Sequence, residues 1–206
     1  MYDVSTSVDY NTWINRKRAF LRRLERDLVT GYFDMELYTL IKLLNSFDDM
    51  FTLSSCSGRL MLFSSKRPWD RKSIKIYLKK HNKACVSEVI KTLEESKDKN
   101  LWFVLQPPIL HVSCLTVDRA QELLKLARNV GFKHSGIISF ARTGIVVELR
   151  GNEHLEVPLK LKGKLICRKT RLKTLVKWAN RMLIESKKKI FKLESEIKRN
   201  WLERKR

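Results

Sequence analysis

Glycine and proline are scarce in this sequence, and their scarcity excludes several nucleotide-binding motifs. The chain of 206 residues has only 7 Gly and 4 Pro. Neither G-x-G-x-x-G nor a Walker A motif can be written from these glycines, so a Rossmann fingerprint and a P-loop are both excluded. No Gly-rich or Pro-rich linker and no internal repeat interrupts the chain. We therefore predict a single domain over 1–206, with helical extensions at 9–45 and 170–206.

Long apolar runs are missing as well. The first residues are polar, and no apolar run approaches the ~18 residues that a membrane span requires. This pattern predicts a soluble, cytoplasmic protein that makes no contact with membranes. The oligomeric state is left open by the sequence.

The few cysteines are too dispersed for a disulfide framework or a zinc finger. Cys56, Cys85, Cys114 and Cys167 form no C-x-x-C pair, so we predict reduced thiols. If the segment around His111 is a strand, His111 and Cys114 point to opposite faces and cannot share one ion without a bend. We predict no metal site.

Acidic residues are greatly outnumbered by basic ones. Lys plus Arg is 43 and Asp plus Glu is 22, which gives a net charge of +21 and a pI of about 10.1. A lysine-rich surface that only maintains solubility is one explanation. A polyanionic partner is the explanation we favour, because a pI above ~9 is typical of nucleic-acid-binding domains.

Hydrophobic periodicity predicts helices at both ends of the chain. Apolar residues at three-to-four spacing predict a helix over 11–30 that ends at Gly31, and Asp34 is a candidate cap for a helix over 35–44. A long amphipathic helix with a basic outer face is predicted from Thr170 to the end.

The central part of the chain alternates between strand and helix patterns. Strands are predicted over 50–53, 60–63, 73–78, 101–105, 109–114, 136–141 and 145–149, with a lysine-bearing edge strand over 159–168. Helices are predicted over 86–95 and after Asp118, which is a candidate cap. The fold class is therefore α/β or α+β: a non-Rossmann mixed sheet with flanking helices, a helical N-terminus and a long C-terminal helix.

One segment gathers small polar side chains at a strand end. It contains Thr52, Ser54, Ser55 and Cys56, followed by Gly58 and Arg59. Hydroxyls and free N–H groups at such a turn can hold a phosphate, a carboxylate or a ribose. An ordinary Ser-Gly turn with a solvent-exposed arginine explains the composition equally well.

Other candidate groups are two histidines, one thiol and one helix-to-strand junction. His81 and His111 have the chemistry of general acids or bases. Cys56 is a nucleophile only if a base lies close to it, and a lone strand cysteine is more often a small buried hydrophobe. Ser135 and Gly136 can present backbone close to a ligand, although a junction that needs glycine explains them as well.

Several ordered motifs carry a family resemblance. They are Phe-Thr-Leu-Ser-Ser-Cys-Ser-Gly-Arg (51–59), His81, Pro-Pro-Ile-Leu-His-Val-Ser-Cys (107–114), Gly-Phe-Lys-His-Ser-Gly-Ile (131–137), Leu-Glu-Val-Pro-Leu (155–159), Gly-Lys-Leu (163–165) and Ala-Asn-Arg-Met (179–182). With these motifs the chain resembles the tRNA wybutosine-synthesising protein 3 family over nearly its whole length. Val29, Thr30 and Gly151 depart from residues that the family often has.

The resemblance implies an S-adenosylmethionine-dependent tRNA methyltransferase. Its target is N4 of the 7-(3-amino-3-carboxypropyl)-4-demethylwyosine intermediate at position 37 of tRNA(Phe), in the anticodon loop. Matching positions imply that Thr52, Ser54, Ser55, Cys56, Gly58, Arg59, Ser135 and Gly136 bind the cofactor or the target base. For the proton that the acceptor nitrogen loses, His81 or His111 is the candidate base.

Binding of the tRNA needs cations along the phosphate backbone. The candidates are Arg16, Arg22, Arg23, Arg142 and Lys187. Two alternatives are a non-catalytic basic RNA-binding protein and a cysteine- or metal-dependent RNA-processing enzyme. Binding of S-adenosylmethionine separates the first alternative from a methyltransferase, and metal analysis with thiol alkylation separates the second.

Overall fold

The chain forms two compact units in a computed structural model that describes residues 8–202. Unit 1 comprises residues up to Ser57, Pro108–Asn152 and the chain from Lys188 onward, and unit 2 comprises Gly58–Pro107 and Glu153–Lys187. The first seven and last four residues lie outside the described residues, so the polar start and the end of the predicted C-terminal extension are not assessed. The single domain expected from the sequence stays a prediction.

Unit 1 is built on a four-stranded sheet in the order β1-β5-β7-β6, in which every pairing is antiparallel. The strands are β1 (Met50–Cys56), β5 (Ile109–Cys114), β6 (Gly136–Ala141) and β7 (Gly144–Arg150). The helices are α1 (Tyr10–Val29), η1 (Met35–Leu37), α2 (Tyr38–Asn45), α4 (Val117–Asn129), the last part of α5 (Lys169–Ile197) and η3 (Lys198–Leu202).

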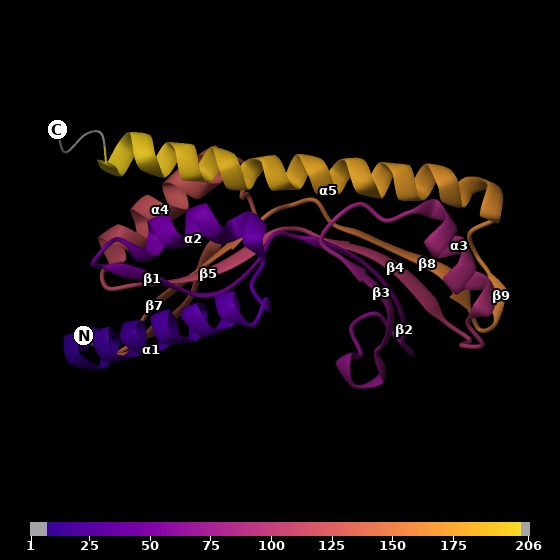
Figure 1. Cartoon of the computed structure of the whole chain (residues 1–206), viewed down its shortest axis with the longest axis horizontal. Helices are drawn as coiled ribbons and strands as arrows, with labels where there is room; N and C mark the ends of the chain where they lie inside the picture. Colours follow the sequence, from indigo (N-terminus) through magenta and orange to yellow (C-terminus); the bar gives the residue numbers. More distant parts are fainter. Residues whose placement is uncertain (1–7, 203–206) are drawn as a thin grey trace, which may run out of the picture. The chain divides into compact units, whose positions relative to one another are not determined.

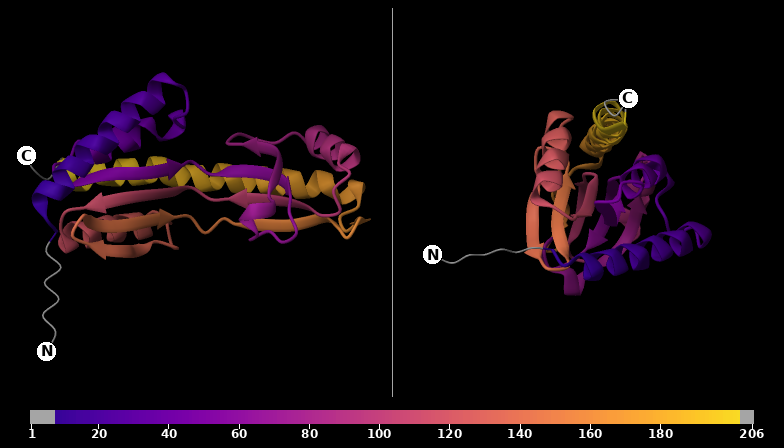
Figure 2. Two further views of the ribbon diagram at one scale, coloured as in Figure 1. Left: turned by 90° about the horizontal axis from the view of Figure 1, so that it is seen from below. Right: turned by 90° about the vertical axis from the view of Figure 1, so that its left-hand side faces the viewer.

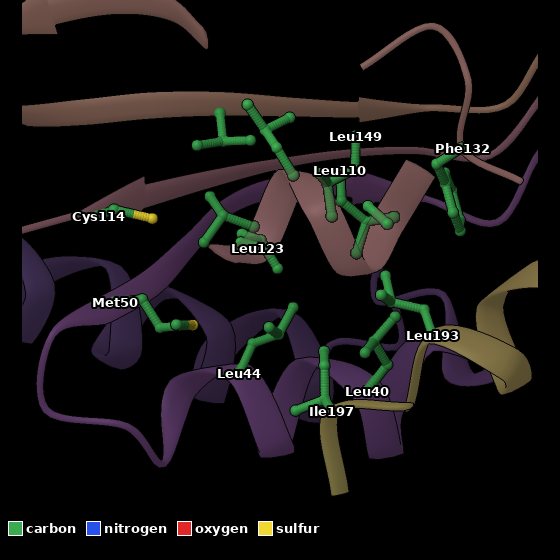
Figure 3. Close-up of a cluster of buried hydrophobic side chains, with 14 of the residues drawn as sticks. Leu40, Leu44, Met50, Leu110, Cys114, Leu123, Phe132, Leu149, Leu193 and Ile197 are labelled. Atoms are coloured by element: carbon green, nitrogen blue, oxygen red, sulfur yellow. The ribbon is translucent and has the colours of Figure 1, made fainter. Parts of the chain in front are cut away.

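The two faces of this sheet are covered differently. Alternate strand residues such as Leu110 and Leu149 join α2, α4 and the end of α5 in the main core of unit 1, where their side chains point toward one another (Figure 3). Because strand side chains alternate between faces, Phe51 and Ser113 point the other way. There they meet Trp13 of α1, whose indole N–H donates to Ser113 Oγ at 3.2 Å. Figures 1 and 2 show α1 and α4 on opposite sides of the strands.

Unit 2 is built on a five-stranded antiparallel sheet in the order β3-β2-β4-β8-β9. Its elements are β2 (Arg59–Ser64), η2 (Arg71–Ser73), β3 (Lys75–Lys80), α3 (Val86–Glu95), β4 (Leu101–Gln106), β8 (Leu155–Leu161), β9 (Lys164–Leu165) and the first part of α5. Leu172, Val176 and Leu183 of α5 pack with residues of α3 on one face of the sheet. Figure 1 shows α3 and the first part of α5 on the same side of these strands. A smaller apolar cluster around Met61 and Phe63 lies on the other face.

The predicted fold class is confirmed, with helices at both ends of the chain and no Rossmann arrangement. Among the described residues the strands pair into two sheets, and every pair is antiparallel. Within residues 8–202, no helix is both long enough and apolar enough to cross a membrane.

Two local predictions were wrong, and a third was confirmed only in part. Thr116 caps α4 by accepting a hydrogen bond from Arg119 N at 3.2 Å, while Asp118 lies in the first turn. Asp34 occupies the predicted N-cap position before Met35, but its side chain makes no capping hydrogen bond and accepts from Ser57 N at 2.8 Å. The predicted strand over 159–168 is a hairpin whose turn residues, Lys162 and Gly163, both have positive φ, as a two-residue type I′ turn requires.

Candidate functional site

A row of polar residues crosses the sheet of unit 1 on the face that carries α1. The registers pair Ser54 with His111, His111 with Glu148, and Glu148 with Gly136. These four residues therefore stand side by side on β1, β5, β7 and β6. Three of them, Ser54, His111 and Gly136, are sequence-predicted site residues that lie far apart in the chain.

Side chains in this row form a continuous hydrogen-bonded chain. Nδ1 of His111 lies 2.9 Å from Ser54 Oγ, and Nε2 lies 3.0 Å from Glu148 Oε2. A carboxylate only accepts hydrogen bonds, so the ring proton of neutral His111 is on Nε2 and Nδ1 accepts from the serine hydroxyl. Glu148 thus fixes the tautomer that leaves Nδ1 able to take a proton.

Ser54 is the most accessible side chain of this hydrogen-bonded chain. Ser54 is exposed, whereas the side chains of His111 and Glu148 are 25% and 23% accessible. A ligand on this face meets the Ser54 hydroxyl first, with His111 behind it. A hydroxyl, an imidazole and a carboxylate bonded in this order can pass a proton inward and stabilise the imidazolium that results.

The other predicted residues of β1 differ in their environment. Thr52 is hydrogen-bonded to the side chain of Asn45, which accepts from Thr52 N at 2.8 Å and donates to Thr52 Oγ1 at 3.1 Å. Ser55 and Cys56 are half-buried and pair with Leu110 and Ile109. Thr52 therefore holds α2 against β1, and Ser55 and Cys56 continue the strand beyond its expected end.

Ser57 follows the strand and is fully buried. Its backbone N–H is satisfied by Asp34, but its hydroxyl oxygen has no hydrogen-bond partner among the described residues. A buried hydroxyl without a partner carries a free-energy penalty that a bound polar group would relieve.

Ser135 and Gly136 lie at the start of β6. The Ser135 hydroxyl donates to Phe132 O at 2.7 Å and accepts from Arg150 N at 3.0 Å, so it braces the junction between α4 and the sheet. A side chain added at Gly136 would have no neighbour within 4 Å. At Gly136, therefore, no neighbouring atom fills the space beside the last position of the polar row.

Gly58, Arg59 and His81 belong to unit 2. Gly58 has φ +93° and its carbonyl accepts from His81 Nδ1 at 3.0 Å, which places the acceptor nitrogen of neutral His81 at Nε2. Arg59 Nε donates to Gln106 Oε1 at 2.7 Å. Its terminal guanidinium nitrogens have no hydrogen-bond partner within the described residues.

None of the four cysteines forms a disulfide. Burial raises the pKa of Cys114 to about 12, helped by the nearby charge of Asp49, so this thiol is not a nucleophile at neutral pH. The predicted reduced state of the cysteines agrees with the structure.

The predicted tRNA-contacting cations occupy several surfaces. Arg16 donates to the Thr143 carbonyl at 3.2 Å and so ties α1 to the β6–β7 hairpin, where Arg142 is exposed. Arg23 lies 3.6 Å from Asp27. Arg22 lines an open hollow of about 730 Å³ along α1. Lys187 is half-buried on the part of α5 in unit 2.

Sequence reasoning missed Glu148 and Ser57. Glu148 had a weak signal, because it is the one charged residue in the apolar run 144–149. Ser57 had none beyond its place in the polar segment. Partners 37 and 57 positions from His111 in sequence are found only when the strands are paired.

Comparison with known proteins identifies a family. The profile of a family described as Methyltransferase TYW3 matches residues 15–199. A relative from Thermococcus sibiricus is 36% identical over 184 residues, which cover 89% of this chain and 93% of the relative. A relative from Archaeoglobus fulgidus is 37% identical over 164 residues, covering 80% of this chain and 82% of the relative. Both are named tRNA(Phe) 7-((3-amino-3-carboxypropyl)-4-demethylwyosine(37)-N(4))-methyltransferase.

Solved structures show the same fold. The PH1069 protein from Pyrococcus horikoshii aligns with a TM-score of 0.86 and 33% identity, covering 91% of this chain and 96% of that one. A hypothetical protein from Aeropyrum pernix aligns with a TM-score of 0.73 and 31% identity, covering 81% of this chain and 98% of that one.

Proposed function

The chain belongs to the TYW3 methyltransferase family, and from this premise we propose that it acts on tRNA(Phe). Its substrate is the 7-(3-amino-3-carboxypropyl)-4-demethylwyosine base at position 37, which it methylates at N4, as the names of its relatives state for them. The net charge of +21 supports a polyanionic substrate. The cytoplasm, where this reaction would take place, stays a prediction.

The methyl donor we propose is S-adenosylmethionine, which supplies an electrophilic methyl group when bound. The polar segment at the end of β1 suits it. Ser57 Oγ is buried without a hydrogen-bond partner among the described residues, and the neighbouring Ser55 adds a second hydroxyl. Hydroxyls at these positions can bind the carboxylate, the ammonium group or the ribose of the donor. Cofactor contacts by Cys56, Gly58 and Arg59 stay predictions.

Ser54, His111 and Glu148 carry the proposed chemistry. The acceptor nitrogen gains a methyl group and must lose a proton. Ser54 Oγ can accept a hydrogen bond from that nitrogen while donating its own proton to His111 Nδ1, 2.9 Å away. Glu148, 3.0 Å from Nε2, stabilises the positive charge that then develops on the imidazole. His111 is therefore the base, Ser54 relays the proton, and Glu148 positions His111.

His81 is the second candidate base predicted from the sequence. Its Nδ1 donates to the Gly58 carbonyl and fixes one tautomer. The continuous chain through Ser54 and Glu148 is the observation that favours His111.

An unpaired anticodon-loop base can leave its stack at modest cost, and nearby phosphates then need cations. On unit 1 we propose exposed Arg22 and Arg142 as contacts. Arg16, held by Thr143, and Arg23, near Asp27, are already engaged within the protein. They contribute mainly to the positive potential.

The experiment that tests this function uses tRNA(Phe) bearing the unmethylated precursor. The purified protein with S-adenosylmethionine is expected to convert the nucleoside at position 37, detected by mass spectrometry as the addition of one methyl group. S-adenosylmethionine at 100 times its Kd is also expected to raise the Tm by ~5–10 °C.

A non-catalytic RNA-binding protein gives a different result. It binds tRNA(Phe) but neither responds to S-adenosylmethionine in Tm nor changes the mass of the nucleoside. That pair of observations would overturn the proposed function.

A further inference from the structure

We propose that unit 2 has its own RNA-binding site, a hollow on α5 that holds phosphates of the tRNA backbone beside an exposed tryptophan. The site consists of Lys83, Lys177 and Arg181, with Trp178 at its side. The identity of the RNA rests on the proposed function. The site itself rests on the geometry and charge of unit 2.

The hollow has a volume of about 350 Å³ and is open to solvent. Its lining residues are Lys83, Lys177, Asn180, Arg181, Ile184 and Glu185. All but Lys83 belong to α5 and recur at intervals of three and four, so they form one face of the helix. Lys83 comes from the loop that precedes α3.

Two hydrogen bonds fix this loop to the helix. Asn180 Oδ1 accepts from Ala84 N at 2.9 Å, and Asn180 Nδ2 donates to Ala84 O at 2.9 Å. Ala84 is itself buried in the core of unit 2. Lys83 is therefore held beside Lys177 and Arg181 by the fold, which reduces the entropy lost when an anion binds.

The three cations outnumber the single carboxylate of the hollow, that of Glu185. Other lysines of unit 2 have partners, such as Lys80 with Glu88 and Lys169 with Glu94. Lys83, Lys177 and Arg181 make no ion pair within residues 8–202. Between positions 169 and 187, α5 has six basic residues and one acidic residue. A concentration of positive charge at the hollow complements a row of phosphates.

Trp178 indicates RNA rather than a free anion. It is 55% exposed, although tryptophan normally buries most of its surface in a core. The Arg181 guanidinium lies 5.5 Å from its ring centroid. An indole next to a cation offers a stacking surface for an unpaired base whose phosphates bind the lysines.

The test measures binding of tRNA(Phe) as a function of KCl concentration. A triple variant, Lys83→Ala, Lys177→Ala and Arg181→Ala, is expected to bind ~10–100-fold more weakly at 0.1 M KCl, with a salt slope reduced by ~2–3. Trp178→Ala is expected to weaken binding ~10-fold and to leave the slope unchanged.

Matched controls remove the same amount of positive charge, or the same indole, elsewhere in unit 2. Lys72→Ala, Lys79→Ala and Lys97→Ala together remove three exposed lysines, and Trp69→Ala removes an exposed tryptophan (73% accessible). Both are expected to bind within about threefold of the original protein, since they remove no proposed contact. Equal losses in the two triple variants would show a general charge effect and overturn the proposal, as would unchanged binding in both.

Two further measurements separate this proposal from the proposed function. Inorganic phosphate is expected to compete with tRNA only weakly, because it cannot stack on Trp178. If inorganic phosphate competes effectively with tRNA at equal phosphate concentration, the hollow is a simple anion site and does not bind RNA specifically. Methyl transfer by the unchanged protein is measured on the same tRNA. If no methyl group is transferred, the proposed methyltransferase function is wrong, and the binding experiment still decides whether the hollow on α5 binds RNA.

Discussion

His111 has different hydrogen-bond partners at its two ring nitrogens, and this asymmetry allows a sharp test at the scale of single residues. With Ser54 at Nδ1 and Glu148 at Nε2, the ring has a fixed tautomer and a fixed orientation. Loss of the ring removes the proposed base, whereas loss of the Glu148 charge removes the group proposed to stabilise it.

We therefore expect His111→Asn to lower kcat for methyl transfer by ~10²–10⁴-fold. Glu148→Gln keeps the shape of the side chain but cannot stabilise an imidazolium, so kcat is expected to fall by about 10-fold or more. Single-turnover rates are the measurement. KM for tRNA and the Tm are expected to stay unchanged, which a purely structural role would not produce.

Glu156 provides the matched control. It lies 3.9 Å from His154 in a second His–Glu pair, on the surface of unit 2. Glu156→Gln is expected to leave kcat unchanged. Near-normal rates for both His111→Asn and Glu148→Gln would contradict the assignment of His111 as the base. His81 would then be the remaining candidate.

The residues of the candidate site were only partly predictable from the sequence. The residue type and motif indicated His111, and the motif indicated Ser54. Glu148 was not identified, because its role depends on which strand lies next to β5. Thr52 and Ser135 were predicted ligand contacts that the structure uses for internal hydrogen bonds, since a hydroxyl in a sequence gives no sign of its partner.

At the scale of elements, α4 shows how a start signal is misassigned. Thr116 Oγ1 accepts from Arg119 N at 3.2 Å, whereas Asp118 lies inside the first turn. Both residue types favour helix starts. The structure decides between them, because only Thr116 has the extended backbone of a capping residue.

Thr116→Ala is accordingly expected to destabilise the protein by about 1 kcal/mol, measured by urea unfolding. Asp118→Asn is the control. It removes only a favourable interaction with the helix dipole and is expected to cost about 0.3–1 kcal/mol or less. A larger loss for Asp118→Asn than for Thr116→Ala would contradict the cap assignment.

Elements with strong local patterns were predicted closely. The helix over 86–95 and the strands over 109–114 and 136–141 have the predicted bounds. Apolar periodicity marks the helix locally, and Pro108 and Gly136 mark the starts of the two strands. The hairpin at Lys162 and Gly163 was missed. Its alternating lysines continue the strand pattern through the turn, and only the Lys-Gly pair indicates a reversal.

At the scale of the whole molecule, a net charge of +21 opposes folding through self-repulsion. Added salt screens this repulsion, so the Tm is expected to rise by on the order of 5 °C between 0.01 M and 0.3 M KCl. Differential scanning calorimetry without tRNA is the measurement. The same titration near pH 10.1, the sequence pI, is the control.

Near its pI the molecule has little net charge, and the salt effect is expected to vanish there. A Tm that falls with salt at neutral pH would show that attractive ion pairs outweigh the repulsion.

The sequence by itself determined the fold class, the positions of most elements, the basic character and the family, because each of these is written in local patterns and composition. Tertiary structure alone decided which side chains meet. A shift of one residue in strand register moves every side chain to the opposite face of a sheet. The pairing of β1, β5 and β7 thus turned a serine, a histidine and a glutamate into one hydrogen-bonded chain.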